Sequence, residues 1–418
     1  MSKRSIVFCA GLLALWVGAC GSPHQQVYYP LPGDGERPAP APAPVEPSGD
    51  VEPVAAATDE TPVSGWKYQQ RLDKAVKFLL DTQKKDGGWG HFLPERPGDI
   101  YIGGLNTLLG FGNASTALCA MGLMLQPETP EINAALVKGI KHMIDAPDAA
   151  RIDGGTFYDT WAHAYMLTAL ARGLKDDRLA DLHAGMRGRI KLELKRLAEL
   201  QGLSGGWGYY DWNESTYRQS GEMATSFTTA TALVSLKELQ DAGIDVSKRE
   251  IEIGLDFLER LRIPTGAYCY SVDHTYYPHG TPNKVRGSLG RSQAGDNALI
   301  SWDRTLKAAD IKAAMDRFFK DHVFIEIGRS RQWPHEAWYA TAPYYYYYGH
   351  YYAARNLDHL PQENRNDYAG KLADLIARTQ YDDGSFWDYP LFGYTKAYGT
   401  GFGVLILSYC KQHLADAK

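Results

Sequence analysis

The chain has 418 residues, with 44 lysines and arginines against 49 aspartates and glutamates, so its formal net charge at pH 7 is −5. This balance gives no indication of nucleic-acid binding, because proteins of that class carry a basic face or stripe. Beyond residue 20 there are three scattered cysteines, an odd number that argues against a disulfide framework or a cysteine-rich metal site. Cys119 and Cys410 stand inside apolar runs, and we expect both to be buried.

The first 20 residues have the features of a secretion signal. Lys3 and Arg4 form a short basic region, residues 6–17 are apolar, and small residues precede Cys20. Because it ends on cysteine, the segment resembles the lipobox signal of bacterial lipoproteins. The resemblance implies that Cys20 becomes the lipidated N-terminus and anchors the protein to a membrane of the cell envelope. The alternative is an ordinary secretory signal with an incidental cysteine.

The residue after the cysteine bears on which membrane holds the anchor. It is Gly21, whereas an aspartate there commonly retains lipoproteins at the inner membrane. We therefore expect the outer membrane if the cell has two. Residues 21–65 are rich in proline and alanine and poor in large apolar side chains, which predicts a disordered linker acting as a semi-rigid spacer.

Residues 66–415 are predicted to form one all-α domain in which two kinds of helix alternate. Amphipathic helices are expected on the outside, and helices that are apolar on nearly every face are expected to be buried. The outer helices are expected near 71–83, 131–145, 187–201, 248–262, 308–326 and 365–380. The inner helices are expected near 113–125, 160–173, 225–240, 291–303, 343–357 and 399–414. Six such hairpins make an (α/α)6 toroid, since each hairpin must cover the apolar flank of its neighbour.

A phrase recurs at the ends of the outer helices: a glutamine, three residues, a glycine, a small residue and an aromatic residue. Complete copies stand at 83–89, 201–207 and 380–386, and degenerate copies at 151–157 and 262–268, with a weak one near Gly328 and Trp333. A repeat with a period of roughly 60 residues determines architecture better than any single site does.

These repeats resemble those of the prenyltransferase and squalene-oxidase superfamily, whose members are terpenoid cyclase-like, over about residues 66–415. The resemblance implies that each glutamine ties the end of an outer helix to a neighbouring repeat while the aromatic ring packs over it. It implies a structural role for Gln83, Trp89, Gln201, Trp207, Gln380 and Phe386. Ligand contact is the alternative role for these residues.

The loops from outer to inner helices are long, and most loops from inner to outer helices are short. All loops of one kind lie on one rim of a toroid, and long loops are usually functional or disordered. These loops are rich in tryptophan and tyrosine, unlike disordered segments. We therefore expect an aromatic-lined central cavity that opens on this rim. The candidate ligand residues are Tyr158, Asp159, His163, Trp212, Tyr270, Asp296, Tyr345, His350, Asp388 and Tyr398.

Some of these residues have structural alternatives. Asp159 and Asp296 stand near the starts of inner helices, where an acidic side chain often serves as a cap. Of the five consecutive tyrosines at 344–348, we expect about two to face the cavity. Arg286 and Arg291 flank a glycine-containing segment and could meet a carboxylate or phosphate, or form an ion pair between loops.

The residues favour ligand binding over the chemistry of the resembled superfamily. The acidic Asp-x-Asp-Asp segment with which squalene-type cyclases protonate an alkene does not occur in the sequence, and the zinc pattern of protein prenyltransferases has glycine in place of its histidine. We expect no metal and no cofactor. The expected function is that of an envelope lipoprotein that binds a lipid or glycan ligand. The alternative is a polysaccharide-active or isoprenoid-active enzyme that uses rim carboxylates.

Overall fold

The computed structural model describes residues 66–90, 105–149, 159–209, 224–331, 333–390 and 393–415. The chain divides into Met1–Lys67 and Tyr68–Lys418, and all helices below belong to the second unit. Cys20, the linker at 21–65, Tyr158 and Trp212 lie outside the described residues.

Six inner helices form a closed ring, which confirms the predicted all-α toroid. Each inner helix packs against the next, and the last packs against the first. They are α3 (Leu105–Met124), α5 (Asp159–Gly173), α7 (Ser226–Asp241), α9 (Leu289–Ser301), α12 (Tyr345–Arg355) and α14 (Tyr394–Ala415). Their residues are buried on nearly every face, because helices enclose them on all sides. An 18-residue stretch of α3 is apolar enough to span a membrane, but 83% of it is buried in this ring.

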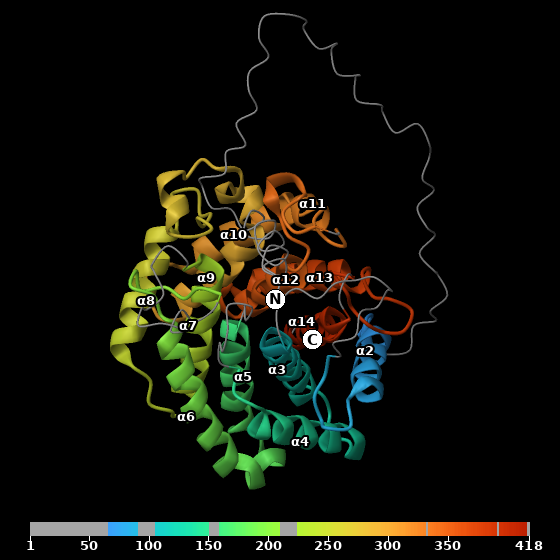
Figure 1. Cartoon of the computed structure of the whole chain (residues 1–418). Coiled ribbons are helices and arrows are strands. Elements are labelled where there is room, and N and C mark those ends of the chain that lie inside the picture. Colours follow the sequence, from blue (N-terminus) through green and yellow to red (C-terminus); the bar gives the residue numbers. More distant parts are fainter. Residues whose placement is uncertain are drawn as a thin grey trace, which may run out of the picture. The chain divides into compact units, whose positions relative to one another are not determined.

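The outer layer consists of amphipathic helices that bury one face against the inner ring. They are α2 (Gln69–Thr82), α4 (Pro130–Asp145), α6 (His183–Leu200), α8 (Lys248–Leu261), α10 (Ala308–Lys320) and α13 (Gln362–Ala377). Short helices fill the connections: η2 (Asp177–Leu182), η4 (Asp273–Tyr276), η5 (Thr281–Asn283), η6 (Val285–Gly287), α11 (Val323–Glu326), η7 (Trp338–Ala340) and η8 (Asn356–His359). Figure 1 shows the first outer helix, α2, beside the last inner helix, α14, which it contacts.

The three repeated glutamines make the same contact in three places. The side-chain amide of Gln83 donates to the carbonyl of Ala135 on α4, 2.8 Å away. Gln201 donates in the same way to Glu250 on α8, and Gln380 donates to Arg71 on α2. Each glutamine also donates to the carbonyl of the glycine four residues later. Each therefore joins its repeat to the outer helix of the next one, and Gln380 joins the end of the ring to its start.

The glycine of the phrase is required for two reasons: its φ angle is positive, and the backbone of the next outer helix lies too close for a side chain. At Gly205 the φ angle is +99°, a conformation that favours glycine. A Cβ there would lie 2.5 Å from the carbonyl oxygen of Ile253 on α8, so the loop contacts the helix backbone directly. Gly87 and Gly384 have the same geometry against α4 and α2.

The aromatic residue of the phrase is buried between the two layers. The indole nitrogen of Trp207 donates to the Leu197 carbonyl on α6, and its backbone amide donates to the Thr229 hydroxyl on α7. Trp89 makes the equivalent bonds, and the amide of Phe386 likewise donates to a threonine hydroxyl. By contrast, Trp333 is 60% exposed, so the weak copy of the phrase has no buried aromatic residue.

Three helices differ clearly in extent from the prediction. The first inner helix, predicted near 113–125, is α3, which begins at Leu105. The predicted outer helix at 308–326 is divided into α10 and α11 at Asp321. The Asp321 side chain forms an ion pair with Arg286. The last inner helix, predicted to begin near Gly399, begins at Tyr394. Gly399 lies inside this helix and allows it to pack closely against the loop at Phe386. A Cβ at Gly399 would lie 2.4 Å from the Phe386 carbonyl oxygen. The three described cysteines, Cys119, Cys269 and Cys410, are free and buried.

Candidate functional site

Six aromatic side chains from three inner helices gather at the ring axis. We name them the axial cluster: Trp161, Tyr165, Phe227, Tyr345, Tyr348 and Tyr352. Phe227 lies at its centre, with its ring centroid 5.8 Å from that of Trp161 and 5.2 Å from that of Tyr345. Ring pairs at these separations stabilise one another beyond the area that they bury.

The rings of the axial cluster contact one another, whereas the sequence predicted rings that line an open central cavity. Apart from the half-buried Trp161, each member is at most 5% exposed. The physical reason is spacing: Tyr345, Tyr348 and Tyr352 share one face of α12 and meet Phe227 of α7 and Tyr165 of α5 across the ring. The aromatic axis is therefore present as a packed cluster.

The five consecutive tyrosines turn in different directions. Tyr345 and Tyr348 belong to the axial cluster. Tyr346 lies 4.3 Å from the His350 ring, and the Tyr347 hydroxyl donates to Thr379 at the end of α13, so both face the outer layer. Tyr344 is half-buried next to Tyr345. Two of the five reach the axis.

A second set of rings, half-buried, lies at the end of the axis where the inner helices begin. We name it the rim group: Tyr209, Tyr270, His274, His335 and Tyr344. Tyr270 connects it, with hydroxyl contact to Tyr209 and with its ring 5.3 Å from His274 and 6.1 Å from His335. The rim group is continuous with the axial cluster, because the Tyr270 ring also lies 5.4 Å from Phe227.

The two arginines that flank residues 287–290 have different surroundings. Arg286 is exposed and pairs with the Asp321 carboxylate, 3.0 Å away, which is the ion pair between loops that the sequence left open. Arg291, in the first turn of α9, is only 2% exposed. Its guanidinium carbon lies 5.3 Å from the Tyr270 ring centroid and 5.8 Å from that of Tyr345.

The two histidines of the rim group are neutral near pH 7. Burial, with a contribution from the charge of Arg291, lowers the pKa of His274 to about 4. Burial also lowers the pKa of His335, and Arg291 acts in the same direction. The Nδ1 of His335 lies 2.7 Å from the Ala340 carbonyl and so carries the proton, which leaves Nε2 to accept from Tyr344.

The opposite end of the axis is closed by charged side chains. The Glu238 carboxylate at the end of α7 lies 2.7 Å from Arg172 of α5 and 2.9 Å from Arg355 of α12. Although burial raises the pKa of Glu238, the two guanidinium groups outweigh this and hold it at about 2. Tyr351 and Tyr409 lie beside the arginines. Arg172 and Arg355 stand near the C-termini of inner helices, where positive charges also interact favourably with the helix dipoles.

Two predicted acids have raised pKa values but point to protein partners. Asp296 accepts from the Tyr268 hydroxyl at 2.8 Å and from Arg262 at 3.3 Å, within the degenerate copy of the phrase. Burial raises its pKa to about 6. Asp388 accepts from the Tyr398 hydroxyl at 2.7 Å, and burial raises its pKa to about 7 against this hydrogen bond.

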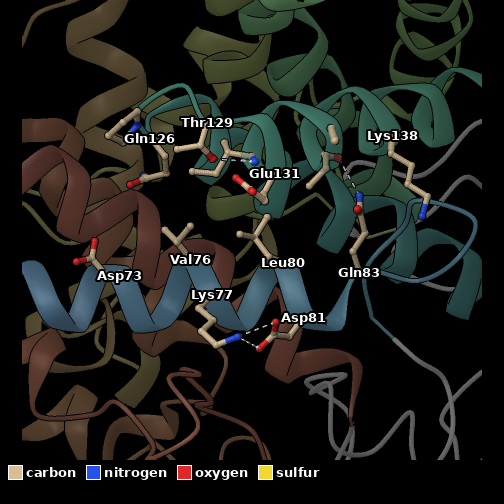
Figure 2. Close-up of a pocket in the computed structure, with 14 residues that line it drawn as sticks. Asp73, Val76, Lys77, Leu80, Asp81, Gln83, Gln126, Thr129, Glu131 and Lys138 are labelled. Atoms are coloured by element: carbon tan, nitrogen blue, oxygen red, sulfur yellow. Dashed lines mark hydrogen bonds and ion pairs between the residues drawn. The ribbon is translucent and has the colours of Figure 1, made fainter.

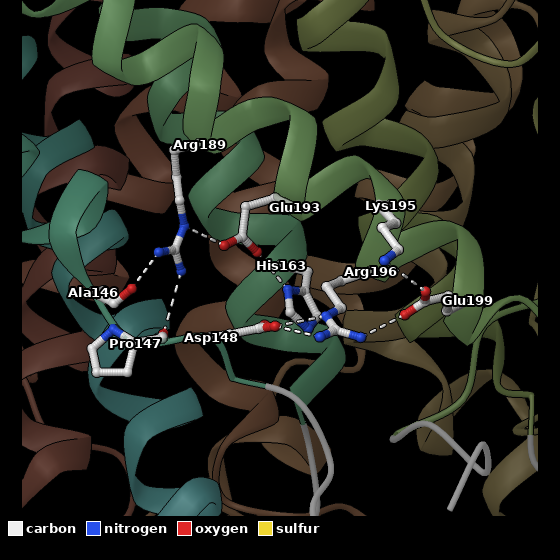
Figure 3. Close-up of polar contacts among 9 residues, drawn as sticks. All are labelled: Ala146, Pro147, Asp148, His163, Arg189, Glu193, Lys195, Arg196 and Glu199. Carbon is white, nitrogen blue, oxygen red and sulfur yellow. Dashed lines mark hydrogen bonds and ion pairs between the residues drawn. The ribbon is translucent and has the colours of Figure 1, made fainter.

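Two predicted histidines face the outer layer rather than the axis. His163 of α5 contacts the Glu193 carboxylate of α6, which Arg189 also holds, as Figure 3 shows. Burial lowers the pKa of His163, but Glu193 raises it by more, so the net shift is upward. His350 lies 2.9 Å from His322, and burial lowers the pKa of both.

The structure therefore brings together only part of the predicted ligand set. Tyr270 and Tyr345 lie at the axis and its rim, and Tyr398 approaches the axis through Phe402. Asp159 is buried at the first residue of α5. Sequence reasoning missed the central role of Phe227 and the charged cluster around Glu238. The signal for the latter was a charged residue in the last turn of otherwise apolar helices.

A surface pocket lies elsewhere, between the outer helices α2 and α4. Its volume is about 780 Å³, and Figure 2 shows Val76 and Leu80 of α2 facing Glu131 and Thr129 on the other side. No aromatic side chain lines it, and the only lining residue among the predicted ones is Gln83, for which the sequence predicted a structural role. In the described part of the chain, no three His, Cys, Asp or Glu side chains are grouped so that they could hold a metal ion.

Comparison with known proteins bears on the fold. Neither a protein family nor a curated protein sequence matches the chain. The structure is similar to that of a variant of the type II terpene cyclase MstE from Scytonema in complex with geranylgeranyl dihydroxybenzoate, with 13% identity, a TM-score of 0.50, and coverage of 82% of this chain and 97% of that one. It is also similar to a D-mannose isomerase, with 12% identity, a TM-score of 0.54, and coverage of 86% and 100%. The chain thus has the terpenoid cyclase-like (α/α)6 toroid fold, which enzymes of unlike chemistry share.

Proposed function

We propose that this protein is a cell-envelope lipoprotein whose toroid binds an apolar or glycan ligand at the aromatic end of the ring, without the chemistry of terpene cyclases. Cys20 carries the lipid anchor, and residues 21–65 space the toroid from the membrane, which is the outer one if the cell has two. The ligand lies over the half-buried rim group and against Trp161, at the end of the axial cluster.

The observation that carries this proposal is the difference between the two ends of the axis. Rings that are half-buried and able to contact a ligand meet at one end, around Tyr270 and Trp161. The other end is tied together by Glu238 and its two arginines. Aromatic faces suit both apolar ligands and the faces of sugars, and a site of this kind with a few polar groups is typical of ligand binding.

The position of Asp296 supports binding rather than catalysis. Asp296 is engaged by Tyr268 and Arg262, away from the rings of the axis. Fold alone carries no argument for an activity, because toroids of this kind support unrelated functions.

Ligand binding is tested by identifying small molecules that the purified protein retains. We expect mass spectrometry of extracts to find a lipid or glycan with the wild-type protein and much less with Trp161→Ala. Trp338→Ala, at a residue 71% exposed, is the matched control and should retain the wild-type amount. Equal retention by Trp161→Ala and the control, with both variants folded, would contradict the proposal.

The anchor has a separate test. Cells fed labelled palmitate should label the wild-type protein and not Cys20→Ser, and this variant should leave the membrane fraction. A variant that keeps both the label and the membrane association would remove the lipoprotein assignment while leaving ligand binding intact.

An enzymatic function is the second candidate, favoured by Asp388. A buried carboxyl with a pKa of about 7 is suited to donate a proton near neutral pH, and such groups are frequent at active sites. If the retained molecule is converted by the wild-type protein and Asp388→Asn abolishes the conversion without loss of binding, the enzymatic function replaces the binding function.

A further inference from the structure

We infer that the ligand carries an anionic group, a carboxylate or a phosphate, which Arg291 binds at the rim group. This inference rests on the binding function proposed above and names the chemistry of its ligand.

The first observation is that Arg291 is buried without a counter-ion. One terminal nitrogen of its guanidinium donates to the Pro282 carbonyl, and its Nε has no hydrogen-bond partner. Among the residues that the structure describes, no aspartate or glutamate forms an ion pair with it. A buried charge without a partner is costly, so a compensating anion would stabilise this arrangement.

Arg189 shows what the same fold does with a buried arginine of structural function. It is 6% exposed, and its Nε donates to the Glu193 carboxylate at 2.5 Å. Its Nη1 donates to the Ala146 carbonyl, so it ties two outer helices together. Arg291 is buried more deeply than Arg189 and lacks the carboxylate.

The second observation is that aromatic rings pack against the Arg291 guanidinium. The ring centroids of Tyr270, from a loop, and Tyr345, from α12, lie 5.3 and 5.8 Å from the guanidinium carbon. The proximity of Arg291 and Tyr345 depends on close contact between α9 and α12, since a Cβ on Gly349 would lie 2.7 Å from the Gly290 Cα. A guanidinium packed against rings and bonded to the Pro282 carbonyl keeps its orientation, and its remaining N–H groups suit the oxygens of a carboxylate or phosphate.

The two histidines beside Arg291 supply no charge of either sign. His274 and His335 are neutral near pH 7, because burial and the charge of Arg291 disfavour their charged forms. A neutral glycan or hydrocarbon would contact the rings but would leave the guanidinium uncompensated. The expected ligand therefore combines an aromatic or apolar body with one anionic group.

The test uses the full chain in a nonionic detergent and four probes, titrated by calorimetry against a blank of detergent alone. The probes are biphenyl-4-carboxylate, the uncharged biphenyl-4-carboxamide, biphenyl-4-yl phosphate and inorganic phosphate. We expect at least one of the two anionic biphenyls to bind tenfold or more tightly than the carboxamide, and the tighter of the two identifies the anion. Inorganic phosphate alone should bind more weakly than the biphenyl phosphate.

Arg291→Gln should remove the preference for the anion while leaving the affinity for the carboxamide unchanged. Arg286→Gln is the matched control, five residues away, exposed and paired with Asp321, and it should keep the preference. The comparison of probes on the wild-type protein remains decisive even if Arg291→Gln does not fold.

Two results would overturn the inference and leave the binding function standing: equal affinity of the wild-type protein for carboxylate, phosphate and carboxamide, or an unchanged anion preference in Arg291→Gln. Failure of every biphenyl probe to bind the wild-type protein would count against both proposals.

Discussion

Replacing Gln380 tests whether the ring is closed in solution. Its side-chain amide donates to Arg71 at 2.8 Å and to Gly384 at 2.9 Å, so it joins residues 309 positions apart in the chain. Gln380→Ala removes both hydrogen bonds and leaves two carbonyl groups without this donor. At about 1 kcal/mol for each bond, we expect the free energy of unfolding to fall by about 2 kcal/mol.

Gln380→Glu is a sharper perturbation of the same contact, because it preserves shape and reverses the hydrogen-bonding role. At pH 7 the ionised carboxylate would face two carbonyl oxygens and donate to neither, so this variant should be less stable than Gln380→Ala. Repulsion raises the folded-state pKa of the new carboxyl group above its unfolded value. Its stability should therefore recover as the pH falls from 7 to 4, where the protonated group regains one donor.

Urea unfolding followed by circular dichroism measures both effects, with Gln83→Ala as the matched control. Gln83 makes the equivalent contact between two repeats that are consecutive in the chain. We expect similar losses for the two alanine variants. A loss of about 2 kcal/mol for Gln83→Ala with none for Gln380→Ala would show that the first and last repeats do not unfold as one unit, and the closed ring would be refuted.

Four other substitutions, one of them a control, test particular contacts. The raised pKa of Asp388 means that its neutral form is favoured in the folded state, so stability should fall by up to about 4 kcal/mol as the pH rises from 4 to 7, and Asp388→Asn should abolish this dependence in urea titrations at each pH. Glu238→Gln leaves two half-buried guanidinium groups without a carboxylate and should cost about 2–3 kcal/mol by the same assay; an unchanged midpoint would exclude a role in stability. Gly254→Ala places a Cβ 2.6 Å from the Trp207 ring and should cost about 1–3 kcal/mol, whereas Gly370→Ala, with no atom within 4 Å, should stabilise α13 by up to about 1 kcal/mol; the reverse order would contradict the packing.

The architecture could be predicted because the repeated phrase encodes a local structure together with its long-range contact. The glycine at position 205 or 384 adopts a positive φ angle, and the same turn brings the glutamine against the next outer helix. The phrase therefore specifies a whole contact between repeats, and it can be recognised in the sequence without knowing which helix it contacts. The threonines that accept from the aromatic amides, such as Thr229 and Thr400, take part in the same contact but could not be recognised from the sequence.

The directions of the inner-helix side chains could not be predicted in the same way. These helices are apolar all round, so they have no polar face that shows which side meets the axis. His163 faces Glu193 and His350 faces His322, partners that come from other elements and that nothing in the local sequence identifies. For the same reason, only the structure shows that Arg291 is buried while its Nε has no hydrogen-bond partner.

Since α14 packs against both α2 and α3, the first repeat follows the last in space just as any other repeat follows its predecessor. Five inner helices continue through the chain into the next outer helix, and only the sixth such passage, from Ala415 to Gln69, is not covalent. A linker there would allow new termini in the connection at 302–307, between α9 and α10. Such a circular permutant would contain every helix and every glutamine contact between repeats. We therefore expect the toroid to form whichever repeat is synthesised first.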